Sequence, residues 1–127
     1  MAILYRISKR KNNIRSEGEI NYILQAVSRG EVDIEQLSYE ISNECTLTQT
    51  DVYAVLDALG RKMKSHLEDG KTVSLENIGR FKIGFKGIAQ PTKSLLRTKD
   101  IQRFHINYQP TLKLKRWLQK GLLLEKE

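Results

Sequence analysis

The stretch Leu75-Glu-Asn-Ile-Gly-Arg-Phe-Lys-Ile-Gly-Phe-Lys86 alternates apolar and basic side chains over its second half. On one side of an extended chain it places Phe81, Ile83 and Phe85, and on the other side Arg80, Lys82 and Lys86. A period of two with aromatic and β-branched residues predicts a half-buried strand. Because no acidic residue stands between Arg80 and Lys99, the exposed face of this strand is cationic.

A second alternating run follows further along the chain. One of its faces carries Phe104, Ile106 and Tyr108, and the other carries Arg103, His105 and Asn107. The segment between the two runs is basic and lacks a regular apolar pattern. Two strands joined by a basic excursion predict a ribbon or arm that reaches away from a small core.

Elements of both kinds surround this ribbon. Alternation predicts strands at residues 2–9 and 21–27, which can pair as a hairpin around a basic turn at Lys9–Asn13, and a short strand at 71–75. A last helix is expected from Leu112 to about Lys120, opened by Pro110 and Thr111 and stopped by Gly121. The mixture predicts an α+β protein.

Two helices have start signals in the sequence. Asp33 with Gln36 is the pattern of a capping box and predicts a helix from about 34 to 44. Thr48 with Asp51 repeats the pattern, and this helix is expected to end at Glu68-Asp-Gly70. Both helices carry wide apolar stripes that need a cover. The strand face of Phe81, Ile83 and Phe85 is one candidate cover, and a second copy of the chain is the other.

The charge of the chain is unevenly distributed. Residues 1–30 carry a net charge of +4, residues 31–70 carry −6 and residues 71–127 carry +9, within a total of +7. Such asymmetry indicates that the basic parts bind a polyanion. The alternative is that the lysines are simply solvated surface.

Composition narrows the class of protein. A chain of 127 residues with 39% hydrophobic and 29% charged residues is expected to form one soluble domain, with or without an extension. No apolar run approaches 18 residues and no signal peptide is recognisable, so neither a membrane partner nor export is expected. Cys45 is the only cysteine, which excludes an internal disulfide and fits the cytoplasm.

Several phrases, in this order, resemble the bacterial histone-like HU/IHF family of DNA-binding proteins. They are Leu47-Thr-Gln-Thr-Asp-Val, Val55-Leu-Asp-Ala-Leu, Leu67-Glu-Asp-Gly-Lys-Thr-Val-Ser-Leu, Ile78-Gly-Arg-Phe and Tyr108-Gln-Pro-Thr-Leu-Lys-Leu-Lys. The first thirty residues are similar to an HU-related variant with an added N-terminal segment. This divides the chain into an N-terminal β extension (1–31), an HU-like DNA-binding domain (32–120) and a C-terminal tail (121–127).

The resemblance implies an intertwined homodimer. Helices of both subunits would form its base, a β-saddle would lie on the DNA, and two β-ribbon arms would clamp the minor groove, as HU and IHF do when they bend a duplex. It further implies double-stranded DNA as the partner, low sequence specificity, condensation of DNA and a location in the cytoplasm at the nucleoid. The rival interpretation is an HU-like dimer kept as a structural or protein-interaction module with weak or no DNA binding.

Cations on the strands and the arm are the expected phosphate contacts. The candidates are Arg80, Lys82, Lys86, Lys93, Arg97, Lys99 and Arg103, with Lys113, Lys115 and Arg116 flanking the saddle and Lys9, Arg10 and Lys11 extending the footprint. In the family, the tip of the arm reads Arg-Asn-Pro and its proline is the wedge between bases. Here the arm is residues 87–99 with Gln90-Pro91-Thr92 in that place, so Pro91 is a candidate wedge or a turn proline. Leu95 and Leu96 are rival wedges, or contacts between the two subunits of the dimer.

No catalytic or cofactor motif is recognisable, so neither enzyme activity, a small-molecule substrate nor a metal is expected. His66 and His105 lack metal-ligand partners at a suitable spacing, and no Gly-Lys-Ser/Thr follows Gly79, Gly84 and Gly87 to make a phosphate loop. Cys45 and Trp117 both continue apolar stripes and are expected in the core; the alternatives are a nucleophilic thiol at Cys45 and a ring that stacks on a base at Trp117.

Overall fold

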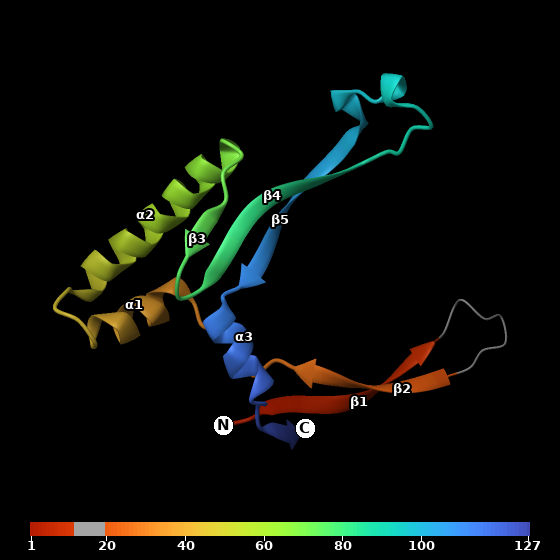
Figure 1. Cartoon of the computed structure of the whole chain (residues 1–127). Coiled ribbons are helices and arrows are strands. Elements are labelled where there is room, and N and C mark those ends of the chain that lie inside the picture. Colours follow the sequence, from red (N-terminus) through yellow and green to blue (C-terminus); the bar gives the residue numbers. More distant parts are fainter. Residues whose placement is uncertain (12–19) are drawn as a thin grey trace. The chain divides into compact units, whose positions relative to one another are not determined.

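The computed structural model describes residues 1–11 and 20–127 and shows an α+β protein, as predicted (Figure 1). Two compact units make up the chain. The first comprises Met1–Asp33 with Leu118–Glu127, and the second comprises Ile34–Trp117. The domain boundaries drawn from the sequence stay a prediction.

The first unit is a three-stranded sheet. Strand β1 (Ile3–Lys11) pairs antiparallel with β2 (Ile20–Val27), from Leu4 opposite Val27 to Lys11 opposite Ile20, which confirms the predicted hairpin. On the other side of β1, the short strand β6 (Leu124–Lys126) pairs in parallel, within the segment expected to be a tail. The basic turn was wrong for Lys9 to Lys11, because β1 continues through them. Asn12 and Asn13 lie outside the described residues.

Arg29 follows β2 and bonds to two other parts of this unit, the residue before β1 and a residue of β6. Its Nε donates a hydrogen bond to the carbonyl oxygen of Ala2 at 2.8 Å, and its Nη2 lies 2.9 Å from Glu125 Oε2. Because both charged groups are more than half exposed, the ion pair contributes little stability by itself. The two contacts nevertheless fix where the chain leaves β2 relative to β1 and β6.

The helices of the second unit begin as their start signals predict. Helix α1 (Ile34–Ser42) begins directly after Asp33, and α2 (Gln49–Glu68) follows Thr48, whose Oγ1 accepts a 3.2 Å hydrogen bond from the Asp51 backbone N–H. Two backbone hydrogen bonds close the end of α2. The Gly70 N–H donates to the Leu67 carbonyl oxygen at 3.0 Å, and the Lys71 N–H donates to the His66 carbonyl oxygen at 3.1 Å. With Gly70 at φ 78°, these form a Schellman motif.

The sheet of the second unit is the predicted ribbon with one short strand beside it. Its antiparallel order is β3 (Val73–Leu75), β4 (Gly79–Gly87) and β5 (Ile101–Pro110). In Figure 1, β4 and β5 continue as a two-stranded ribbon beyond the end of β3. Pro110 ends β5 rather than opening the last helix, which is α3 (Leu112–Gln119).

One face of the ribbon is apolar because opposite residues of an antiparallel pair share a face. Phe81 pairs with Tyr108, Ile83 with Ile106, and Phe85 with Phe104. The rings of Phe81 and Tyr108 stack at 5.0 Å between centroids. The rings of Phe85 and Phe104 meet edge to face at 6.1 Å. The predicted alternation is therefore confirmed in both strands.

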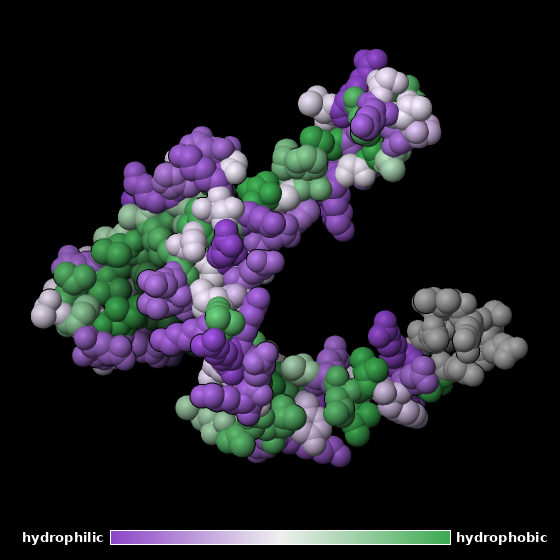
Figure 2. Space-filling model, viewed as in Figure 1, coloured by the Kyte–Doolittle hydropathy of each residue, from purple (hydrophilic) through white to green (hydrophobic). Residues whose placement is uncertain are grey.

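The single chain buries very little. Among the described residues only Ser38, Val52, Leu67 and Gly79 are buried, and hydrophobic side chains lie exposed over α1 and α2 (Figure 2). Cys45 and Trp117 are exposed, so their placement in a core was wrong for the single chain: Cys45 lies beyond the end of α1, and α3 buries no residue. No described helix is long and apolar enough to cross a membrane.

Candidate nucleic-acid interface

The second face of the β4–β5 ribbon carries the positive charge. The register places Arg80 opposite Gln109, Lys82 opposite Asn107, Gly84 opposite His105, and Lys86 opposite Arg103. We call this set the cationic face: Arg80, Lys82, Lys86, Arg103, His105, Asn107 and Gln109. Four of the predicted phosphate contacts are thus brought together on one surface, and the sequences of β4 and β5 contain no acidic residue.

The charges of the cationic face are not neutralised within the described part of the chain. The ion pairs there are Arg29–Glu125, Arg61–Asp57 and Lys71–Asp69, and none includes a residue of this face. Near the base of the ribbon, Arg80, Lys82, Asn107 and Gln109 line a polar hollow of about 110 Å³ together with Thr72. The hollow offers hydrogen-bond donors without a carboxylate, which suits an anionic group.

Gly84 makes room for two side chains of the cationic face. A Cβ atom at Gly84 would lie 2.6 Å from His105 Nε2 and 2.9 Å from Asn107 Nδ2. The imidazole of His105 and the amide of Asn107 therefore occupy the space that a side chain at Gly84 would fill. His105 Nδ1 is buried and has no hydrogen-bond partner. This arrangement was not predicted from the sequence, although a glycine that interrupts an alternating strand is a signal of a close approach.

Gly79, at the start of β4, is expected to be intolerant of any side chain. Its φ is +156°, and a Cβ there would lie 2.3 Å from the backbone oxygen of Gln109. We expect Gly79→Ala to lower the free energy of unfolding by about 2 kcal/mol or more, since backbone atoms must move. Denaturant unfolding of the variant measures this loss.

Gly84→Ala is the matched control for Gly79→Ala. The atoms that its Cβ meets are the ends of the His105 and Asn107 side chains, which can rotate away. We expect a loss of less than about 1 kcal/mol here. Equal losses at the two glycines would contradict the register of β4 against β5.

The tip of the ribbon is closed by residues 88–100, which include two short 3-10 turns, Lys93–Leu95 and Thr98–Asp100. The Asp100 carboxylate accepts a 2.9 Å hydrogen bond from the Arg97 backbone N–H, and the Asp100 carbonyl accepts one from Ile88 at 2.9 Å. These bonds hold the two chain segments together at the base of the tip, next to a shift of the β4–β5 register between Lys86 and Gly87. The predicted contacts Lys93, Arg97 and Lys99 and the candidate wedge Pro91 all lie exposed in the tip.

The remaining predicted contacts lie elsewhere. Lys113, Lys115 and Arg116 are exposed on α3, and the ion pairs among the described residues do not include them. Lys9 and Arg10 are exposed on β1 in the first unit. His66 lies in the last turn of α2, and the described residues contain no group of three His, Cys, Asp or Glu that could hold a metal ion.

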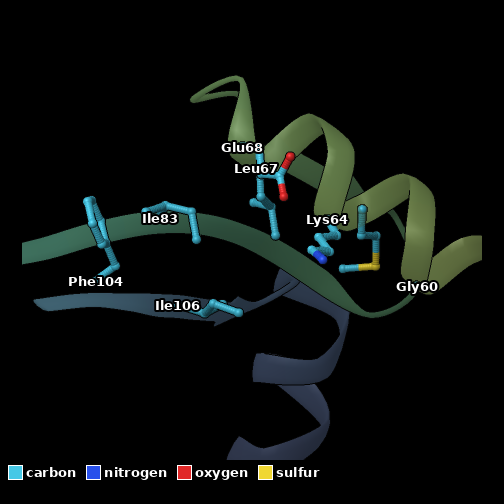
Figure 3. Close-up of a pocket in the computed structure, with 8 residues that line it drawn as sticks. Gly60, Lys64, Leu67, Glu68, Ile83, Phe104 and Ile106 are labelled. Carbon is cyan, nitrogen blue, oxygen red and sulfur yellow. The ribbon is translucent and has the colours of Figure 1, made fainter.

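An apolar groove lies on the opposite face of the ribbon, between β4, β5 and α2. It has a volume of about 600 Å³ and is lined by Gly60, Met63, Lys64, Leu67, Glu68, Ile83, Phe104 and Ile106. Figure 3 shows Leu67 descending from α2 toward the ribbon, with Ile83 on β4 and Phe104 and Ile106 on β5. Phe104 and Ile106 are 69% and 62% exposed, so the groove is apolar and open.

Comparison with known proteins agrees with this architecture. A family model described as "HU domain fused to wHTH, Ig, or Glycine-rich motif" matches residues 1–126. The fold also resembles the crystal structure of a "Putative bacterial DNA binding protein" from Bacteroides vulgatus ATCC 8482, with a TM-score of 0.65 and 10% identity. That match covers 98% of this chain and 47% of the other, so this chain spans about half of that protein's length. No curated protein matches the chain.

Proposed function

The chain belongs to the family of HU domains fused to other motifs, and we propose that it is an architectural protein that binds duplex DNA with low sequence specificity. Binding is through the cationic face and the tip of the ribbon, and it bends or compacts the duplex. Such a protein works on chromosomal DNA at the nucleoid. It needs no cofactor and catalyses no reaction.

One observation carries this proposal. Arg80, Lys82, Lys86 and Arg103 lie on one face of a ribbon that contains no acidic residue. Cations that repeat at the spacing of strand residues suit the regular spacing of phosphates along DNA. The binding free energy of such contacts comes from released counterions, so it does not depend on the base sequence. A ribbon in the minor groove reads mainly groove width and A·T content.

Low specificity is tested by the affinity of the full chain for unrelated duplexes. We expect the dissociation constants of several random duplexes of equal length and A·T content to agree within about tenfold, because phosphate contacts dominate. Fluorescence anisotropy at low salt measures this. A single sequence bound about a thousandfold more tightly than the rest would show base readout and contradict the proposal.

The open groove supports a homodimer as the DNA-binding form. Val52 and Leu67 are the buried hydrophobic side chains of the described chain, while Ile83, Phe104 and Ile106 remain open in the groove. An apolar surface of this kind needs a cover. A second copy that lays its own helices and ribbon against the groove provides one, and the dimer then presents two cationic faces to one duplex.

Bending is proposed to depend on an apolar wedge at the tip, with Pro91 in that role. Pro91 is exposed in the tip, as are Leu95 and Leu96, and an apolar side chain pushed between base pairs unstacks them and kinks the duplex. We expect Pro91→Ala to reduce the bend angle seen by FRET between the ends of a short duplex. Thr92→Ala, a small change next to it, is the control. An unchanged bend in Pro91→Ala would remove Pro91 as the wedge and leave Leu95 and Leu96.

A further inference from the structure

Strand β2 has an unoccupied outer edge. The first sheet has the order β2-β1-β6, so β2 pairs with β1 on one side, and among the residues that the structure describes no strand pairs with its other side. Its eight residues run in register with β1 from Val27 to Ile20 without a bulge. Every second residue of such a strand turns its N–H and C=O away from the sheet.

The composition of β2 leaves this edge unprotected. Ile-Asn-Tyr-Ile-Leu-Gln-Ala-Val27 contains no charged residue, no proline and no glycine. The other edge strands described are protected against pairing by their short length or their charges. Strands β3 and β6 have three residues each, β6 carries Glu125 and Lys126, and β5 carries Arg103. Since soluble proteins normally protect long edges with charges, proline or bulges, an unguarded edge of eight residues marks a strand-pairing site.

We propose that β2 pairs antiparallel with β2 of a second copy of this chain, about a two-fold axis at Ile23. In this register Ile23 stands opposite its own copy, Tyr22 opposite Leu24, Asn21 opposite Gln25, and Ile20 opposite Ala26. Apolar residues meet apolar residues, amide meets amide, and no charge is brought opposite another charge. Two three-stranded sheets thereby become one sheet.

The exposure of β2 agrees with this partner. Tyr22 and Leu24 share a face and are 66% and 69% exposed, and both gain a cross-strand neighbour in the pair. A register shifted by one residue would set Ile23 opposite Leu24. The apolar face of one sheet would then be continued by the more polar face of the other. The self-complementary register therefore favours a second copy over an arbitrary peptide. The contact uses neither the apolar groove nor the cationic face, so it does not depend on DNA binding.

Disulfide trapping tests the register. In a Cys45→Ser background, Ile23→Cys places the two cysteines opposite each other with Cα atoms about 5 Å apart, within disulfide range. Asn21→Cys is the matched control on the same face of the same strand, because its two copies lie four residues apart along the pair, about 13 Å. Under mild oxidation we expect Ile23→Cys to form covalent dimers at least about tenfold faster than Asn21→Cys. Mixing Asn21→Cys with Gln25→Cys restores the cross-link.

Equal cross-linking of Ile23→Cys and Asn21→Cys, or none in either, would overturn the proposal. Amide hydrogen exchange of the unaltered chain gives a second test that needs no variant. Pairing on both sides predicts protection of every amide from Asn21 to Ala26. Fast exchange at every second amide would show a free edge and overturn the proposal independently of whether DNA binds.

Discussion

Replacing Arg80 and Lys82 with glutamate is expected to weaken duplex binding by at least about 100-fold at low salt. The two side chains share the cationic face and line its polar hollow, and neither has an acidic partner among the described residues. The double variant removes two phosphate contacts from each chain and sets two carboxylates against the DNA. Fluorescence anisotropy with a random duplex measures the loss.

Arg61→Glu with Lys62→Glu is the matched control, since it reverses one arginine and one lysine on α2 and changes the net charge equally. Arg61 pairs with Asp57 one turn away, an exposed pair whose loss costs little stability. If this control weakens binding as much as the Arg80 and Lys82 variant does, net charge alone governs affinity and the cationic face is not the binding surface.

Placing a carboxylate in the apolar groove is expected to have the largest effect on the assembly. Ile106 lines the groove opposite Ile83, and in a dimer a second copy covers both. We expect Ile106→Asp to cost about 3 kcal/mol or more, because a buried charge would lack a partner. Light scattering is predicted to show a lower mass for the variant than for the unaltered chain, and circular dichroism is predicted to show a loss of helix.

The neighbouring residue supplies the control. Asn107→Asp adds the same carboxylate to the same strand, but on the cationic face opposite Lys82. We expect it to keep the mass of the unaltered chain and to weaken DNA binding. A monomer mass for the unaltered chain, or an unchanged mass and stability for Ile106→Asp, would contradict a dimer built on the groove.

The elements of the fold could be predicted from local signals. Thr48 and Asp51 mark the start of α2 because the cap is a bond between residues three apart, and Gly70 marks its end through its left-handed backbone. The two faces of the ribbon follow from the period of two in the sequence. Both kinds of signal involve near neighbours in the chain, so one sequence suffices to find them.

What the sequence did not predict depends on distant contacts. The pairing of β6 with β1 joins residues more than a hundred positions apart, and three residues carry no periodic pattern. The position of His105 over Gly84 depends on the exact register of β4 and β5. Cys45 and Trp117 were expected in a core because apolar periodicity shows that a face is covered, but not whether the same chain covers it.

The salt dependence of duplex binding tests the central claim most directly. Each phosphate contact adds about −0.9 to the slope of the logarithm of affinity against the logarithm of salt concentration. With four cations of each cationic face engaged in a dimer, the affinity is predicted to fall by at least about a thousandfold between 50 and 200 mM salt. An affinity that stays flat over this range, or no binding at the lowest salt, would contradict DNA binding through the cationic face and favour a protein-interaction role.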